Sequence, residues 1–192
     1  HEIKNPLTPI QLAAERLRRK FLERLPEADR EVLDRPTHTI VAQVEALKAM
    51  VNAFGDYARP PRLELRPIQL SRIVREVVDL YAGEAARMVI RLHLPEDEPA
   101  VRADAGRVRQ LLHNLLRNAE EAQPEGRAQV DLALYGATDG SRSYFELEVR
   151  DHGPGFPESL RDRLFEPYTT TKPKGTGLGL AIVKKIVEEH GG

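Results

Sequence analysis

Two narrow apolar stripes in the first sixty residues constrain this chain more than any other feature. In both stripes apolar residues recur every three or four positions, and a helix presents such a row as one seam. The first stripe consists of Ile3, Leu7, Ile10, Ala14, Leu17 and Phe21, and the second of Ile40, Val44, Leu47, Val51, Phe54 and Ala58. The spacing predicts a helical hairpin whose arms are separated by a polar, proline-bearing stretch at residues 23–36.

Two helices with single narrow seams cannot enclose a core alone, because most of their surface faces water. The simplest completion is a second copy of the hairpin, which gives a four-helix bundle. We therefore predict that residues 1–59 form a dimerisation hairpin and that the protein is a homodimer.

Composition narrows the class of protein. With 192 residues, 41% of them hydrophobic, the chain can build a core, and 29 Lys and Arg against 30 Asp and Glu do not make the basic surface of a nucleic-acid binder. The absence of cysteine excludes disulfides and thiolate metal sites and fits a reducing compartment. No apolar run approaches the roughly 18 residues that cross a bilayer, so we expect any membrane anchor to lie outside this chain. The first residue, His, and the final glycines suggest a fragment.

Three prolines in residues 58–67 indicate either a stiff linker or an edge strand that leads into a second domain, with a boundary near residue 60. Beyond it the patterns predict helices at 70–81, from Asp104 as N-cap, and at 179–190. They also predict strands at 88–94, 128–136 and 144–150. This order indicates an antiparallel or mixed sheet covered by helices on one face. The predicted fold class is thus α+β, with a second domain at residues 60–192.

The predicted helix after Asp104 carries two asparagines at the margin of its buried stripe. At 100° per residue, Asn114 and Asn118 fall on the same side of the helix. Amide oxygens suit a Mg²⁺ ion that is already bound to phosphates. The alternative is that paired asparagines only edge a helix.

Two glycine-bearing segments follow. In DHGPGF, Asp151 ends a predicted strand, and Gly153 and Gly155 would let a flat ligand approach the backbone; most Asp-Gly turns are only turns. Further on, Gly175, Gly177 and Gly179 precede a helix whose positive end suits phosphate, although such glycines also serve close packing.

Residues 157–174 are rich in polar side chains and are predicted to form a mobile lid over a nucleotide cleft. Lys172 and Lys174 could reach phosphates from this segment, and a solvated loop is the alternative.

Together these motifs resemble the ATP-binding domain of sensor histidine kinases, Hsp90-type chaperones, gyrase-type topoisomerases and mismatch-repair ATPases. HNLLRNAEEA is similar to the N box of that family, DHGPGF to its G1 box, LFEPYTTTK to its F box and GTGLGLAI to its G2 box. The resemblance implies an α/β-sandwich that binds Mg-ATP, with Asn118 and Asn114 at the metal and Asp151 at adenine. It also implies a nucleotide-binding role for Gly153, Gly155, Thr170, Lys172, Gly175, Thr176, Gly177, Leu178 and Gly179.

The opening HEIKNPLTPI resembles the H box, which separates histidine kinases from the other families. With MVNAFGDYARPP it is similar to the NtrY-like sensors of nitrogen regulation. We hypothesise that Pro6 and Pro9 loosen the first helix so that Glu2 can reach the His1 ring. The competing interpretation is that both prolines simply start a regular helix.

These features predict Mg-ATP-dependent autophosphorylation of His1, followed by transfer to an aspartate on the receiver domain of a response regulator. Asn5 lies four residues from His1 and, by resemblance, orients water in the phosphatase direction. The resemblance places the chain in the cytoplasmic part of a membrane-anchored sensor. A phosphatase-dominant sensor and an ATP-gated conformational module are the alternatives.

Overall fold

The computed structural model describes residues 4–58, 62–81, 87–96, 98, 100–123, 127–140, 142–172 and 175–192. The chain divides into two compact units. The first, His1–Pro60 with Thr171–Thr176, is called the hairpin unit below. The second, Pro61–Thr170 with Gly177–Gly192, is called the ATP-binding unit.

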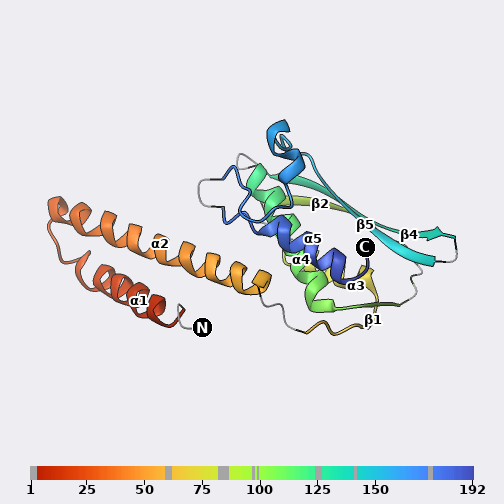
Figure 1. The fold of residues 1–192 in the computed structure, drawn as a ribbon. Coiled ribbons are helices and arrows are strands. Elements are labelled where there is room, and N and C mark those ends of the chain that lie inside the picture. The colour runs from red at the N-terminus through yellow and green to blue at the C-terminus, as the bar shows by residue number, and fades with distance from the viewer. Residues whose placement is uncertain are drawn as a thin grey trace. The chain divides into compact units, whose positions relative to one another are not determined.

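The hairpin unit contains two helices that lie side by side, α1 (Lys4–Phe21) and α2 (Glu27–Ala58) (Figure 1). The predicted stripes supply its buried contacts, because Leu7, Ala14 and Val44 are all less than a tenth exposed. An ion pair of 2.6 Å between Arg18 and Asp34 adds a polar contact between the helices. α1 is helical from Lys4 onward with Pro9 inside it, whereas His1 and Glu2, on which the hypothesis of a loosened helix depends, lie outside the described residues.

The prediction of a polar connection over residues 23–36 was wrong for most of that stretch, because α2 already begins at Glu27. Pro36 has no N–H to donate to the carbonyl four residues earlier and should weaken the helix there. Side chains donate to two other carbonyls of the same turn. The Thr37 hydroxyl donates to the carbonyl of Leu33 (2.6 Å), and Arg18 Nη1 donates to that of Asp34 (3.0 Å).

The ATP-binding unit contains a three-stranded mixed sheet with the strand order β2-β4-β5. β2 (Met88–His93) pairs in parallel with β4 (Ala128–Asp139), and β5 (Arg142–Asp151) pairs antiparallel with β4. Two short strands, β1 (Arg66–Ile68) and β3 (Val101–Ala103), form a separate antiparallel pair. β1 therefore lies in the proline-rich segment for which sequence offered either a linker or an edge strand.

Helices α3 (Leu70–Asp79), α4 (Ala105–Ala122) and α5 (Gly179–Glu189) pack in this unit, and a short 3-10 helix, η1 (Glu158–Arg163), follows β5. α4 and α5 lie side by side (Figure 1). The core forms where apolar faces of α3 and α4 meet the alternating apolar residues of β4. Its fully buried members include Val74, Val77, Leu112, Leu116, Val130 and Leu132. The predicted α+β class, with a helical region before a mixed sheet and its helices, is confirmed.

The predicted N-cap of α4 is also confirmed. Asp104 Oδ1 accepts hydrogen bonds from the backbone N–H groups of Gly106 (2.9 Å) and Arg107 (3.1 Å), two of the donors that a helix leaves unpaired at its start. Among the described residues, no helix has the length and apolar character needed to cross a membrane.

Candidate nucleotide-binding site

The two asparagines of α4 converge on the start of α5. α4 buries Leu112 and Leu116 completely, and this orientation leaves Asn114 and Asn118 half-buried at the side of the helix. A Cβ atom added to Gly179 would lie 3.6 Å from Asn114 Oδ1 and 3.7 Å from Asn118 Nδ2. Both amides therefore lie beside the first turn of α5, and the lack of a side chain at Gly179 keeps the space next to them open.

The first turn of α5 presents a helix N-terminus at the same place. Leu178, which precedes α5, is fully buried, and its side chain supplies no capping hydrogen bond. The first backbone N–H groups of a helix attract anions because they are unpaired and lie at the positive end of the helix dipole. Neutral amide oxygens beside such an end suit a divalent cation that shares its charge with phosphates. These residues therefore fit a Mg²⁺–phosphate group.

The turn at residues 151–155, called the Asp151 turn below, follows β5 and lies against the C-terminal end of α4. Asp151 is the last residue of β5, and its Oδ1 accepts the Gly153 N–H at 2.9 Å. A Cβ atom on Gly153 would lie 2.7 Å from that oxygen and 3.4 Å from Ala122 Cβ, so a larger residue here would displace the Asp151 carboxylate. Gly155 has a φ of +75°, in the left-handed region that favours glycine. The turn thus holds an exposed carboxylate at the end of the sheet.

A close backbone contact between Tyr168 and Gly177 joins the two ends of the loop of residues 169–176. Tyr168 has a φ of +66°, and its N–H donates to the carbonyl of Gly177 at 2.9 Å. Gly177 has a φ of +64°, and a Cβ atom there would come within 2.6 Å of Tyr168 Cα. The two ends of the loop are therefore held against each other by backbone contact. Sequence pointed to Gly177, but nothing in the residue type of Tyr168 indicated its conformation.

The other predicted site residues are described only in part. His1, Glu2 and Lys174 lie outside the described residues, and Asn5 lies in α1 without a described side chain. Lys172, Gly175 and Thr176 belong to the segment Thr171–Thr176, where the Gly175 N–H donates to the Lys172 carbonyl at 3.1 Å. Thr170 precedes that segment and belongs to the ATP-binding unit. The mobility of the predicted lid stays a prediction.

One pair that the sequence did not indicate lies beside the Asp151 turn. His152 Nε2 is 2.6 Å from Asp131 Oδ2, and the His152 N–H donates to the Gln129 carbonyl at 3.1 Å. The hydrogen bond from His152, aided by Arg91 3.3 Å away, holds the pKa of Asp131 below its ordinary value. Register alone would not have shown this pair, because Asp131 lies opposite Arg150 in the sheet.

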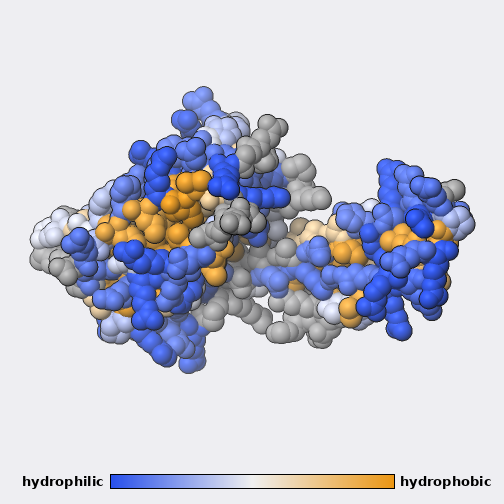
Figure 2. Space-filling view, turned by 180° about the vertical axis from the view of Figure 1, so that it is seen from behind, coloured by the Kyte–Doolittle hydropathy of each residue, from blue (hydrophilic) through white to orange (hydrophobic). Residues whose placement is uncertain are grey.

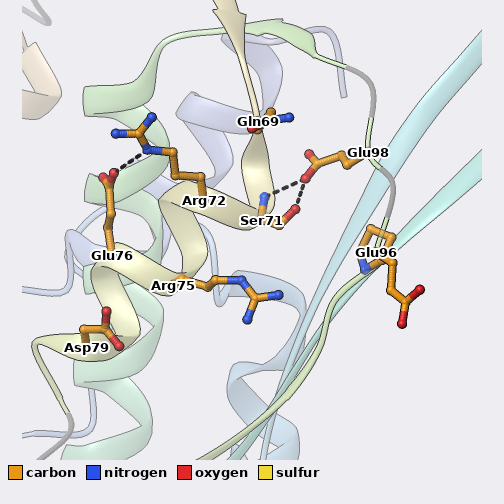
Figure 3. Close-up of a pocket in the computed structure, with 9 residues that line it drawn as sticks. Gln69, Ser71, Arg72, Arg75, Glu76, Asp79, Glu96 and Glu98 are labelled. Atoms are coloured by element: carbon orange, nitrogen blue, oxygen red, sulfur yellow. Dashed lines mark hydrogen bonds and ion pairs between the residues drawn. The ribbon is translucent and has the colours of Figure 1, made fainter.

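A separate hollow lies along α3 and contains none of the predicted site residues (Figure 3). Several of its polar groups already have partners within the protein. Glu98 accepts the N–H groups of Leu70 (2.7 Å) and Ser71 (2.9 Å) and the Ser71 hydroxyl, so a carboxylate already occupies the N-terminal end of α3. Arg72 contacts Glu76 at 3.1 Å. The hollow is open, and its carboxylates outnumber its arginines, so it does not suit an anionic nucleotide.

Comparison with known families agrees with this geometry. Residues 1–62 match the His Kinase A (phospho-acceptor) domain. Residues 103–192 match the family described as the histidine kinase-, DNA gyrase B-, and HSP90-like ATPase. The second match contains the whole of α4, the Asp151 turn and α5.

Individual proteins show the same likeness. The chain is 44% identical over its whole length to the nitrogen regulation protein NtrY of Azorhizobium caulinodans, and it spans 25% of that protein's length. It is similar over its whole length to full-length ShkA in complex with AMPPNP, with 29% identity, a TM-score of 0.72 and 40% of that chain covered. The histidine kinase ThkA in complex with the response regulator protein TrrA gives 28% identity and a TM-score of 0.64, with 100% of this chain and 53% of that chain covered.

Proposed function

Since the chain belongs to the sensor histidine kinases of two-component systems, in their NtrY-like group, we propose that it is the kinase core of such a sensor. It transfers the γ-phosphoryl group of Mg-ATP to His1 and from there to an aspartate of a response regulator. The observation that carries the proposal is the convergence of Asn114 and Asn118 on the start of α5. Residues 1–59 are the phosphotransfer hairpin and residues 60–192 the catalytic domain.

In the proposed nucleotide complex, the exposed Asp151 carboxylate accepts a hydrogen bond from the amino group of adenine. Gly153 and Gly155 give the ring access to the backbone. Asn114 and Asn118 hold the Mg²⁺ ion, which neutralises phosphate charge during transfer. Binding of the phosphates is assigned to the loop up to the first turn of α5: Thr170, Lys172, Gly175, Thr176, Gly177, Leu178 and Gly179.

His1 is the proposed nucleophile. A neutral imidazole nitrogen forms the N–P bond as the bond from the γ-phosphorus to the bridging oxygen breaks, and ADP leaves. The proton on the other ring nitrogen passes to Glu2, the proposed acceptor. Asn5, four residues after His1 in the sequence, is proposed to orient water when a phosphorylated regulator is hydrolysed. Most of the rate enhancement comes from positioning the groups and neutralising charge.

We propose dimerisation because only part of each apolar stripe is buried within the hairpin. Thr37 and Val44 on α2 and Leu7 and Ala14 on α1 are seven residues apart within each pair, and all four are buried. Positions three residues further along each helix are exposed, and they also repeat every seven residues: Ile10, Leu17, Ile40, Leu47 and Phe54. Figure 2 shows apolar side chains at the surface along the hairpin. A second hairpin would cover this outer seam and complete a four-helix bundle.

The proposed partner is the receiver domain of a response regulator. Support comes from the phospho-acceptor family matched by residues 1–62 and from the ThkA structure, which contains a response regulator protein. The likeness to NtrY supports a role in nitrogen regulation. We propose that this part of the protein works in the cytoplasm, where ATP and such regulators are found, and that any membrane anchor lies elsewhere in the protein.

The proposal is tested by incubating the chain with labelled Mg-ATP and measuring phosphate that is stable to base but labile to acid, as expected of phosphohistidine. His1→Gln should abolish the label. His38→Gln is the matched control, because His38 is an exposed histidine elsewhere in the hairpin. Label of equal intensity in His1→Gln would contradict the assignment of the nucleophile.

Binding of ATP without any label would contradict the kinase and favour a phosphatase-dominant sensor or an ATP-gated module. Neither alternative is favoured by the matched families and relatives. Adding a phosphorylated regulator to the unlabelled chain would then distinguish the two, because only a phosphatase releases inorganic phosphate from it.

A further inference from the structure

α4 and α5 contact each other near both ends of α5, and the contact at its C-terminal end lies far from the proposed phosphate site. At the start of α5, Gly179 lies against Asn114 and Asn118. Beyond the end of α5, His190 Nε2 is 3.0 Å from the backbone nitrogen of Asp104, the N-cap of α4. The helices are therefore antiparallel, and α5, with 11 residues, is about 16 Å long. Because a helix this short is stiff, fixing one end along its axis fixes the other.

The contacts of His190 specify one form of its ring. Nδ1 is 2.7 Å from the carbonyl oxygen of Ile186, which can only accept, so Nδ1 carries a proton. Nε2 faces a backbone N–H, which can only donate, so Nε2 is the acceptor. His190 is thus a neutral imidazole whose two nitrogens each have a partner, one on its own helix and one on α4.

The end of α5 presents the ring in the required direction. Gly191 has a φ of +82°, and its N–H donates to the Glu188 carbonyl at 3.1 Å, while the Gly192 N–H donates to that of Val187 at 3.1 Å. These bonds end the helix in a glycine-dependent cap. His190 therefore sits at a defined turn, half-buried, beside the start of α4.

Asp104 connects three segments at this point. Its N–H donates to His190, its Oδ1 caps α4, and its Oδ2 accepts the Glu64 N–H at 2.9 Å. Glu64 lies in the segment that leads into β1. A second polar contact joins the same two helices. Arg107 Nε of α4 lies 3.6 Å from Glu189 Oε2 of α5, and Arg107 is only 5% exposed.

We propose that His190 is a positioning residue for nucleotide binding: its bond to the Asp104 N–H fixes α5 along its axis, and so fixes the first turn of α5 against Asn114 and Asn118. This inference rests on the proposed nucleotide site. Without the acceptor, the Asp104 N–H is left unpaired, and α5 can slide by fractions of an ångström relative to α4. The phosphate-binding groups on α5 and the Mg²⁺ ligands on α4 would then no longer be held at a fixed distance from each other.

The test compares His190→Leu with His190→Gln by calorimetric titration with Mg-ADP. Leucine fills the space without an acceptor, whereas the glutamine Oε1 can accept the Asp104 N–H. We expect about a tenfold loss of affinity in the leucine variant, the effect of 1.4 kcal/mol, and a loss of no more than about twofold in the glutamine variant. His93→Leu, at an exposed histidine on β2, should bind as the wild type does.

Loss of stability alone is controlled by Lys184→Gly. Lys184 is exposed on α5, so glycine there weakens the helix without touching His190. This variant should melt earlier yet keep its affinity for Mg-ADP at a temperature where all variants are folded. Equal losses in the leucine and glutamine variants, wild-type affinity in the leucine variant, or an equal loss in Lys184→Gly would each overturn the proposal.

A spectroscopic measurement needs no variant. Nitrogen chemical shifts of His190 should report the tautomer protonated at Nδ1, and the Asp104 amide should exchange slowly with solvent. An Nε2-protonated ring would overturn the inference. If the wild type shows the expected tautomer but does not bind Mg-ADP, the nucleotide site itself is wrong, and the inference that rests on it is overturned as well.

Discussion

The hairpin unit and the ATP-binding unit keep their apolar side chains in different places. In the ATP-binding unit Leu112, Leu116 and Leu132 are completely buried, whereas Ile10 and Leu47 of the hairpin stripes are nearly half exposed, at 47% and 46%. A side chain hidden within its own chain stabilises the monomer, and one hidden only by a partner makes stability depend on concentration. The ATP-binding unit should therefore fold alone, whereas the hairpin unit should need a second copy.

The largest effect is expected from Leu116→Ala. Removing a fully buried leucine leaves a cavity and should lower the free energy of unfolding of the ATP-binding unit by about 3–4 kcal/mol. Hydrogen exchange in urea, followed separately for α2 and α4, should show the loss in α4 and not in α2. Leu80→Ala, the same change at a residue 72% exposed, is the control. Equal losses in the two helices would contradict the independence of the units.

A smaller effect is expected from Gly177→Ala. A left-handed φ costs an ordinary residue roughly 1–2 kcal/mol, and the new Cβ atom would also press on the Tyr168 backbone. Gly140→Ala is the matched control, because Gly140 has a φ of +57° with no atom within 4 Å of the added carbon. The melting temperature should therefore fall more in Gly177→Ala than in Gly140→Ala, and affinity for Mg-ADP should fall only in Gly177→Ala. Equal losses would mean that the contact with Tyr168 contributes nothing.

In the hairpin unit, a substitution on the exposed apolar seam should weaken dimerisation rather than disrupt the buried core. Leu47→Asp places a charge on the outer seam and should weaken dimerisation about tenfold or more, because a buried charge without a partner is unfavourable. Sedimentation over a range of concentrations measures this change. Val32→Asp lies on the same helix, 72% exposed and off the stripe, and should leave the dimer intact. Dissociation by both variants would show that the seam is not the interface.

The smallest effect is expected from Glu76→Gln, in the way that the melting temperature falls in acid. Hydrogen bonds from Arg109 and then Arg72 hold the pKa of Glu76 below its ordinary value of 4.5, and Arg109 links α4 to Glu76 on α3 at 2.6 Å. A lowered folded pKa means that the unfolded chain binds this proton more readily, so the contribution is present above pH 4.5 and is lost as pH falls through the folded pKa. The melting temperature of Glu76→Gln should therefore fall less steeply with acid than that of the wild type. Parallel curves would show that these ion pairs do not stabilise the unit.

Features that depend on neighbours in the chain were predictable from the sequence. Asp104 caps α4 because a short side chain at that place can bond the next backbone N–H groups. Asn114 and Asn118 lie together because helical geometry alone puts residues four apart on one side. The predicted helix at 70–81 ended only two residues late, a difference within the usual fraying of helix ends.

Features that depend on distant neighbours were not predictable. The polar residues before Pro36 suggested a loop, but α2 already begins at Glu27, and Arg18 on the other helix donates to the Asp34 carbonyl within it. The bond between His190 and Asp104 joins residues 86 positions apart. The conformation of Tyr168 follows from its contact with Gly177 and not from its own preference. No local pattern encodes such contacts.

The parallel pairing of β2 with β4 has a consequence for the time course of synthesis. β2 leaves the ribosome before α4 and before the strand it pairs with, and ribosomes add roughly 5–20 residues per second. For several seconds the apolar residues of β2 thus have no sheet to join, whereas β4 and β5 follow each other directly and can pair at once. Association of β2 is a late step that requires closure of a long loop. The segment Met88–His93 is therefore at risk of aggregation while the chain is being made.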